Sequence, residues 1–239
     1  MTGAGGVLRI AFDMDGVLAD MHAALSIEAE RMFSLQEAAT AQALEDALED
    51  VQAPPVPPQL SLTEEQADAL WRRVAGAYDF WEGLAETEPG IVARLAQIAE
   101  RRRWEVIFLT QRPPTRGSTV QKQTQAWLRR HGYDYPSVFT TRGSRGAIAA
   151  ALHLDVVVDD RFEGCIDVAD ESTARAMLIW RLPDESVPAR ARRLGITVVQ
   201  STGECLALLD HDDRPSVTTT GLFDRLRQAL RRKKAGHQG

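Results

Sequence analysis

Two aspartates stand one residue apart at the end of a short apolar run, a spacing that could carry chemistry. The run extends from Val7 to Phe12 and is followed by Asp13, Asp15 and Gly16. A short, continuous apolar run is typical of a strand that is buried on both faces of a parallel sheet. Open α/β sheets bind ligands at the carboxyl ends of their strands, so we expect both carboxylates at such an end. An ordinary acidic turn is the alternative, because Asp and Gly are common turn residues.

Two later strand segments, each apolar after a charged first residue, end in polar side chains in the same way. Residues 105–109 lead to Thr110, and residues 155–158 lead to Asp159 and Asp160. Because the carboxyl ends of parallel strands meet at one edge of a sheet, we expect these side chains to join the first pair of aspartates. Crowded carboxylates repel one another. Proteins commonly offset this repulsion by binding a hard divalent cation such as Mg²⁺, which prefers oxygen ligands. The sequence therefore predicts a magnesium site at this edge.

These residue types suit phosphoryl transfer. A cation beside an aspartate cancels the repulsion between the carboxylate and a phosphate, so the carboxylate can attack phosphorus and become an aspartyl-phosphate. A second carboxylate nearby can protonate the leaving oxygen and later deprotonate the attacking water. The D-x-D spacing of Asp13 and Asp15 supplies both roles, and Thr110 supplies a hydroxyl donor for the phosphoryl oxygens.

Three segments resemble the motifs of a known superfamily. Asp13-Met-Asp-Gly-Val-Leu-Ala-Asp20, the apolar strand ending in Thr110, and Val156-Val-Val-Asp-Asp-Arg161 resemble motifs one, two and four of the haloacid dehalogenase superfamily. Within it, the first and last of these segments are similar to the 5′(3′)-deoxyribonucleotidases. The resemblance covers roughly residues 7 to 210, and the three motifs in combination are specific for the superfamily.

The resemblance implies a role for each acidic residue. Asp13 is the implied nucleophile and Asp15 the implied acid and base. The presence of Asp15 indicates phosphoryl chemistry, since dehalogenase members lack the second aspartate of motif one. The implied metal ligands are Asp13, Asp15 through its backbone carbonyl, Asp159 and Asp160. The superfamily also places an all-helical C1 cap directly after motif one.

The sequence departs from the superfamily at motif three, where a lysine normally holds the phosphate and the nucleophile. No lysine lies between Lys122 and Asp159, and residues 141–146 occupy the expected place. We expect Arg145, or less favourably Arg142, to supply the charge, and Lys122 is a weaker candidate. Arginine is forked and bulkier than lysine, so replacing the lysine by an arginine changes the shape and the hydrogen-bonding geometry of the site. The alternative is that both arginines lie on the surface and the site is impaired.

Several other side chains are candidates for contact with the rest of a substrate. Trp71, Phe80 and Trp81 are expected to cover the site and stack on a base, with Gln111 in the loop after the second strand as a further contact. The alternative is that these aromatic residues form the core of the helical segment. Arg112 in the same loop either contacts a phosphate or only shapes the loop.

The order of helical and strand patterns predicts a Rossmann-like, doubly wound parallel α/β sheet interrupted by a helical insert. Within the insert, helices are expected over 22–33 and 44–51 and from a capping box at Thr63, with an extended proline-rich linker over 52–59. The predicted division is an α/β core of residues 1–19 and 89–210, a helical cap of residues 20–88, and a linker with a basic amphipathic helix over 211–239.

Charge and composition narrow the classes of partner. The 239 residues carry a net charge of −6, so we expect no general attraction to nucleic acid polymers. No apolar run approaches the ~20 residues that span a bilayer, and the first residues lack a signal-peptide pattern, so we expect a cytoplasmic protein. The basic tail either contacts a partner or an anionic surface, or docks on the body as an ordinary terminal helix. A homodimer is one of the assemblies that the sequence allows.

Together these features predict a Mg²⁺-dependent hydrolase of small phosphomonoesters, with a deoxynucleotide as the candidate substrate. The alternative is a non-catalytic protein that binds phosphate or nucleotides and docks a partner through its tail.

Overall fold

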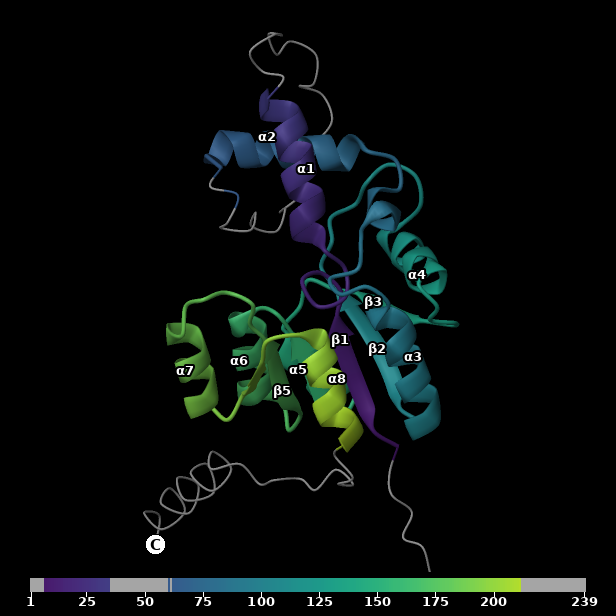
Figure 1. Ribbon diagram of the computed structural model, residues 1–239, viewed down its shortest axis with the longest axis vertical. Coiled ribbons are helices and arrows are strands. Elements are labelled where there is room, and N and C mark those ends of the chain that lie inside the picture. The colour runs from purple at the N-terminus through teal and green to yellow at the C-terminus, as the bar shows by residue number, and fades with distance from the viewer. Residues whose placement is uncertain (1–6, 35–59, 61, 212–239) are drawn as a thin grey trace, which may run out of the picture.

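A parallel β-sheet organises the chain. The computed structural model describes residues 7–34, 60 and 62–211 (Figure 1). The described residues form a six-stranded sheet in the order β3-β2-β1-β4-β5-β6, in which every neighbouring pair is parallel. The strands are β1 (Arg9–Asp13), β2 (Glu105–Thr110), β3 (Ser137–Thr140), β4 (Val156–Asp159), β5 (Arg175–Ile179) and β6 (Thr197–Val199).

Helices connect the strands and also form a separate pair between β1 and β2. The described helices are α1 (Met21–Ser34), α2 (Glu64–Gly76), the 3₁₀ helix η2 (Phe80–Gly83), α3 (Ile91–Arg102), α4 (Val120–Arg130), α5 (Arg145–Ala151), α6 (Phe162–Glu171), α7 (Ser186–Arg193) and α8 (Thr202–His211). Among the described residues, no helix combines the length and the apolar character that a membrane span requires.

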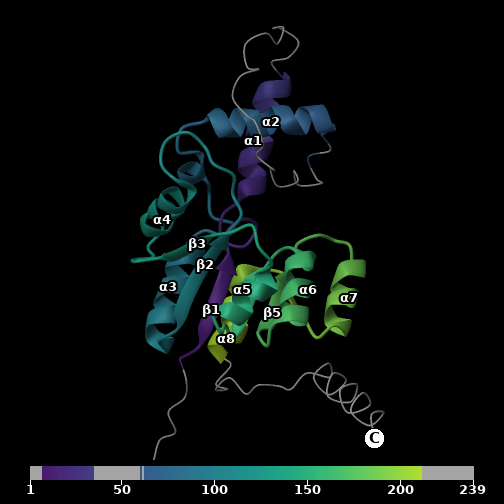
Figure 2. The same ribbon diagram turned by 180° about the vertical axis from the view of Figure 1, so that it is seen from behind.

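Each face of the sheet is covered by its own helices (Figures 1 and 2). Ile10 and Phe12 of β1 belong to a core shared with α3, α4 and α8, whereas Ala11 between them belongs to a core shared with α5, α6 and α7. Successive strand residues face opposite sides, so a strand covered on both faces needs apolar residues on both, and the central strands β1, β2, β4 and β5 are mainly apolar. The expectation of a doubly wound parallel α/β sheet is confirmed.

The direction of winding changes at β1. From β1 the chain proceeds to β2 and β3 on one side, and later to β4, β5 and β6 on the other side. Ligand sites in open α/β sheets form outside the carboxyl ends of the strands at such a reversal. β1 ends at Asp13 and its neighbour β4 ends at Asp159, so two acidic strand ends lie side by side at this point.

The helices α1 and α2 lie beyond the carboxyl ends of the strands and pack against each other (Figure 1). α2 begins with the expected capping box, in which the Thr63 side chain accepts a hydrogen bond from the Gln66 backbone N–H and the Gln66 side chain accepts one in return. α1 covers the helix expected over 22–33. The expected helix over 44–51, the linker over 52–59 and the tail after residue 211 lie outside the described residues. The division into a core and a cap stays a prediction.

Two short segments join these helices to the sheet and run side by side. The backbone N–H of Asp20 donates to the carbonyl of Ala85 at 2.9 Å, and that of Thr87 donates to the carbonyl of Leu18 at 2.8 Å. The Thr87 hydroxyl donates to the carbonyl of Val17, also at 2.8 Å. The loop that follows β1 is therefore held in place by the returning segment.

Candidate active site

Three carboxylates meet where β1 and β4 end. Asp13 is the last residue of β1, Asp159 is the last residue of β4, and Asp160 follows it directly. Each offers a carboxylate oxygen, and the three oxygens lie within 4.8 Å of one another. A cluster made only of carboxylate oxygens matches the ligand preference of Mg²⁺, so the donor set fits that cation.

Burial makes the charges of these carboxylates costly. Burial raises the pKa of Asp13 well above its ordinary value, and the neighbouring charges of Asp159 and Asp160 raise it further, against the opposing effect of Arg145. Burial, followed by the Asp159 and Asp15 charges, raises the pKa of Asp160 to about 8. Burial also raises the pKa of Asp159. The cluster therefore favours any ligand that brings positive charge to it.

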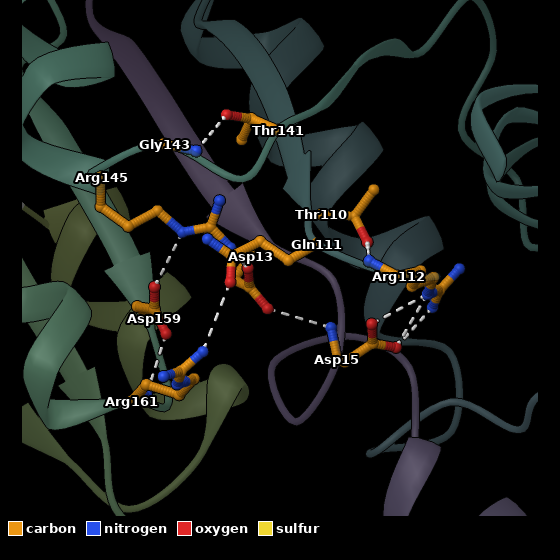
Figure 3. A network of polar contacts seen from close by, with 10 residues as sticks. All are labelled: Asp13, Asp15, Thr110, Gln111, Arg112, Thr141, Gly143, Arg145, Asp159 and Arg161. Atoms are coloured by element: carbon orange, nitrogen blue, oxygen red, sulfur yellow. Dashed lines mark hydrogen bonds and ion pairs between the residues drawn. The ribbon is translucent and has the colours of Figure 1, made fainter. Parts of the chain in front are cut away.

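The carboxylate of Asp15 turns away from this cluster toward Arg112 (Figure 3). The backbone N–H of Asp15 instead donates to Oδ2 of Asp13 at 3.1 Å. The side chains of Asp13, Asp159 and Asp160 thus come together as expected, and the carboxylate of Asp15 does not join them. The metal contact expected of Asp15 uses its backbone carbonyl, and that contact stays a prediction.

Gly16 lets the chain turn sharply after Asp15. Its φ of 77° lies in the left-handed region, which glycine adopts without steric cost. A Cβ atom at this position would lie 1.8 Å from Oδ2 of Asp160, far inside van der Waals contact. Glycine is therefore required here both by the backbone conformation and by the close approach of Asp160.

We expect Gly16→Ala to lower the affinity for Mg²⁺ by about 10- to 100-fold, the usual cost of displacing a ligand or its support. The added methyl group must push the Asp160 carboxylate out of the cluster. Isothermal titration calorimetry measures the change. Gly76→Ala is the matched control, because a Cβ there meets nothing within 4 Å. Equal affinity in both variants would mean that Asp160 does not help to hold the cation.

Arg145 reaches the carboxylates from the start of α5. The hydroxyl of Ser144 accepts hydrogen bonds from the first backbone N–H groups of that helix, which begins the helix at Arg145. Nη2 of Arg145 donates to Oδ1 of Asp13, and Nε donates to Oδ2 of Asp159 at 3.3 Å (Figure 3). Only 7% of the side chain is exposed, yet Nη1 has no hydrogen-bond partner among the described residues. One buried donor is thus available to a ligand.

The other two basic candidates lie elsewhere. Arg142 and Lys122 are both exposed, and no ion pair joins either of them to the described carboxylates. The structure therefore brings Arg145 to the carboxylate cluster and leaves Arg142 and Lys122 at the surface.

The loop after β2 adds two polar side chains. Thr110 is fully buried at the end of β2, and its hydroxyl oxygen accepts the backbone N–H of Arg112 at 3.3 Å. A hydroxyl group that accepts one hydrogen bond can also donate one. Gln111 is half-buried, and its Oε1 accepts a hydrogen bond from Arg161 at 3.4 Å. The contacts of both residues with a substrate stay predictions.

No protein-family model matches the sequence, and a search of curated proteins gives no match. Solved structures do match. A HAD family hydrolase from Deinococcus radiodurans R1, solved with bound phosphate and sodium, is 16% identical and aligns over 86% of this chain and 96% of its own, with a TM-score of 0.50. A HAD-superfamily hydrolase of subfamily IA from Geobacter sulfurreducens PCA is 12% identical and aligns over 85% of this chain and 100% of its own, with a TM-score of 0.49. The chain has the haloacid dehalogenase fold.

The haloacid dehalogenase fold was expected from the three sequence motifs, and that expectation is confirmed. At such low sequence identity the likeness concerns the fold alone. The roles of the individual residues and the resemblance to the deoxyribonucleotidases therefore stay predictions. In this chain, motif one begins at the end of β1 and motif four includes the end of β4, and these two strands are neighbours in the sheet.

Arg112 is the site residue whose importance the sequence did not reveal. Its guanidinium group forms a bidentate ion pair with the Asp15 carboxylate, with Nε at 2.9 Å from both oxygens and Nη2 at 2.7 Å from one. The local sequence indicated only that a charged residue lies two positions after the end of a buried strand. Nothing in the local sequence indicates that its partner is Asp15, 97 positions earlier.

The aromatic candidates belong to the hydrophobic core. Trp81 is fully buried and its Nε1 donates to the carbonyl of Pro113 at 3.0 Å. Phe80 is half-buried and meets the Trp81 ring edge-on, with 5.0 Å between ring centroids. Trp71 is 7% exposed, and its Nε1 has no partner among the described residues. This packing corresponds to the alternative in which the aromatic residues form a core, and stacking on a base stays a prediction.

Proposed function

We propose that the protein is a Mg²⁺-dependent phosphomonoester hydrolase that acts through an aspartyl-phosphate on Asp13. The observation that carries the proposal is Nη1 of Arg145, a buried donor beside the carboxylates of Asp13 and Asp159 that has no hydrogen-bond partner within the described part of the chain. A buried donor without a partner costs about 1–3 kcal/mol, and a phosphate oxygen would satisfy it. Arginine also matches phosphate in charge and geometry.

The same residues can perform a two-step transfer. A carboxylate oxygen of Asp13 attacks phosphorus, the bond from phosphorus to the ester oxygen breaks, and Asp15 gives a proton to that oxygen. Water then attacks the aspartyl-phosphate, Asp15 takes a proton from the water, and the Asp13 carboxylate leaves. Throughout, Arg145 and the Thr110 hydroxyl would stabilise charge on the phosphoryl oxygens.

The carboxylates of Asp13, Asp159 and Asp160, with the backbone carbonyl of Asp15, are the residues that would hold Mg²⁺. When bound, the cation would neutralise the charge shared by the phosphate and the carboxylates. The Deinococcus radiodurans hydrolase of the same fold was solved with bound phosphate and sodium, an anion and a cation of the two kinds that the proposed site would hold.

The substrate class is proposed to be a small phosphomonoester. The similarity of Asp13-Met-Asp-Gly-Val-Leu-Ala-Asp20 to the deoxyribonucleotidases makes deoxynucleoside monophosphates the first substrates to assay. Sugar phosphates and p-nitrophenyl phosphate complete a minimal panel. Release of inorganic phosphate with Mg²⁺, abolished by a chelator, is the expected result. Binding of phosphate without turnover of any panel member would favour the non-catalytic alternative.

We expect Mg²⁺ to raise the thermal unfolding midpoint more at pH 8 than at pH 6. The folded-state pKa of Asp160 is raised from 3.8 to about 8, so without the cation its contribution to stability is complete below pH 4 and is lost as the pH rises toward 8. Mg²⁺ binds the deprotonated carboxylates and so offsets a loss that grows with pH. Differential scanning fluorimetry with and without Mg²⁺ at both pH values measures the effect.

Asp160→Asn should reduce this pH-dependent stabilisation. Asp170→Asn is the matched control, because Asp170 is an exposed aspartate on α6 outside the cluster. Equal stabilisation at both pH values in the unaltered protein would contradict binding of Mg²⁺ at this cluster.

A further inference from the structure

The second buried arginine of the site, Arg112, is engaged differently from Arg145. The side chain of Arg112 is completely buried, and every nitrogen of its guanidinium group has a partner. Nε and Nη2 donate to the two oxygens of Asp15, and Nη1 donates to the hydroxyl of Thr124 on α4 at 3.2 Å. Arg145, by contrast, keeps Nη1 unpaired among the described residues. Because each nitrogen of Arg112 is already engaged within the protein and its side chain has no exposed surface, contact with a phosphate does not explain this residue.

The position of Arg112 is determined by three separate parts of the chain. Its Cζ lies 5.1 Å from the centroid of the Trp81 ring, within the range of a cation–π contact. Trp81 is itself fixed, because its Nε1 donates to Pro113 and its backbone N–H donates to Gln123 at 3.1 Å. The guanidinium plane is thus held by η2, by the loop after β2 and by α4 before it meets Asp15.

Charges at the carboxylate cluster compete with Arg112 for the Asp15 carboxylate. It lies close enough to the cluster to influence Asp13, Asp160 and Arg145 electrostatically. A carboxylate without a fixed partner would be drawn toward Arg145 and toward a bound cation. The fork of an arginine, with two hydrogen bonds in one plane, restrains both oxygens of a carboxylate, which a single bond does not.

We propose that Arg112 is a positioning residue, which holds the Asp15 carboxylate out of the metal cluster and on the side where it serves the leaving group. The inference rests on the proposed function, because it assigns Asp15 the exchange of protons with the ester oxygen. Arg112 acts only through Asp15 and does not touch the phosphate. Loss of Arg112 therefore impairs the steps that need Asp15 and spares those that do not.

The test compares leaving groups in the full-length protein with Mg²⁺. Arg112→Gln should lower kcat/KM on an alkyl phosphomonoester by about 100-fold, because kcat/KM reports the transfer to Asp13 and such a leaving group needs an acid. On p-nitrophenyl phosphate, whose leaving group departs without a proton, the loss of kcat/KM should stay below about 5-fold. The water step needs Asp15 for every substrate, so kcat is recorded separately from this comparison. Arg112→Lys should retain part of the activity, since it keeps the charge and loses the fork.

The decisive comparison repeats Arg112→Gln in an Asp15→Asn background. If Arg112 acts through Asp15, the second substitution causes no further loss on either substrate. Arg130→Gln is the matched control, because Arg130 pairs with Glu82 and so joins the same two elements, α4 and η2, without contact to Asp15. It should behave as the unaltered protein on both substrates.

Removal of a buried arginine can also unfold a chain, so each variant is first checked by circular dichroism and thermal unfolding. If Arg112→Gln does not fold, Thr124→Val takes its place, because it removes only the Nη1 partner and keeps the side-chain shape. It should show the same preference for p-nitrophenyl phosphate, with a smaller loss.

The outcomes separate this inference from the proposed function. An equal loss of kcat/KM on both leaving groups, or a further loss in the Asp15→Asn background, overturns the positioning role and leaves the hydrolase proposal intact. Absence of phosphate release from every substrate by the unaltered protein overturns the proposed function, and the positioning role with it.

Discussion

Asp13→Asn is expected to abolish phosphate release while the chain stays folded. An asparagine amide cannot attack phosphorus to form the covalent intermediate, and loss of a covalent nucleophile usually costs several powers of ten in rate. The fold should persist, because burial and the neighbouring carboxylates already disfavour the charge of Asp13, as its raised pKa indicates. Phosphate release from p-nitrophenyl phosphate and circular dichroism of the same preparation measure the two effects.

Binding should survive the substitution better than turnover does. The Asp13→Asn variant still contains Arg145, whose Nη1 has no partner among the residues that the structure describes, so inorganic phosphate should still bind in the presence of Mg²⁺. Asp170→Asn, at an exposed position on α6, is the control and should keep full activity. Residual activity above about one per cent of the unaltered protein would argue against Asp13 as the nucleophile, given the usual cost of removing one.

Arg145→Ala is expected to lower kcat/KM by about 100- to 1,000-fold, the usual effect of removing a donor that stabilises transition-state charge. The side chain is the buried cation that contacts both Asp13 and Asp159 (Figure 3). Its removal leaves two buried carboxylates without that partner, so the assay should contain Mg²⁺ to limit destabilisation. Steady-state kinetics with the best substrate of the panel measures the loss.

Arg145→Lys should recover much of the activity, because a point charge also serves as a phosphate ligand. Arg142→Ala should cost less, since Arg142 is exposed and forms no ion pair with the described carboxylates. Near-normal activity of Arg145→Ala, combined with inactivation by Arg142→Ala or Lys122→Ala, would show that another residue supplies the charge. If all three alanine variants were active, the phosphate would be held without any of them.

Much of the fold could be predicted from local sequence patterns. The apolar run before Asp13 could be interpreted as a doubly buried strand because a strand covered on both faces carries mainly apolar side chains over its buried length. Thr63 and Gln66 mark the start of α2 because the capping box involves only residues within one helical turn. The haloacid dehalogenase fold was implied by the resemblance of three segments to the motifs of that superfamily, and the doubly wound sheet by the alternation of strand and helix patterns.

The grouping of Asp13, Asp159 and Asp160 was predictable for the same reason. Parallel strands present their carboxyl ends at one edge, so acidic residues at two strand ends lie near each other once both strands are recognised. The sequence by itself thus determined the sheet, the edge where the site lies and the carboxylates that gather there. All of this depends on periodicity along the chain and on a topology with few alternatives.

Only the tertiary structure shows which arginine reaches the carboxylates. Arg142 and Arg145 are three residues apart, and the local sequence favoured Arg145 without excluding Arg142. The start of α5 at Arg145 directs that side chain to Asp13, whereas Arg142 remains in the exposed loop before it. The pairing of Arg112 with Asp15 spans 97 positions and depends on the packing of Trp81 and Thr124 around one guanidinium group. Side-chain direction and long-range pairing arise from packing in three dimensions, and the order of residues along the chain does not encode them locally.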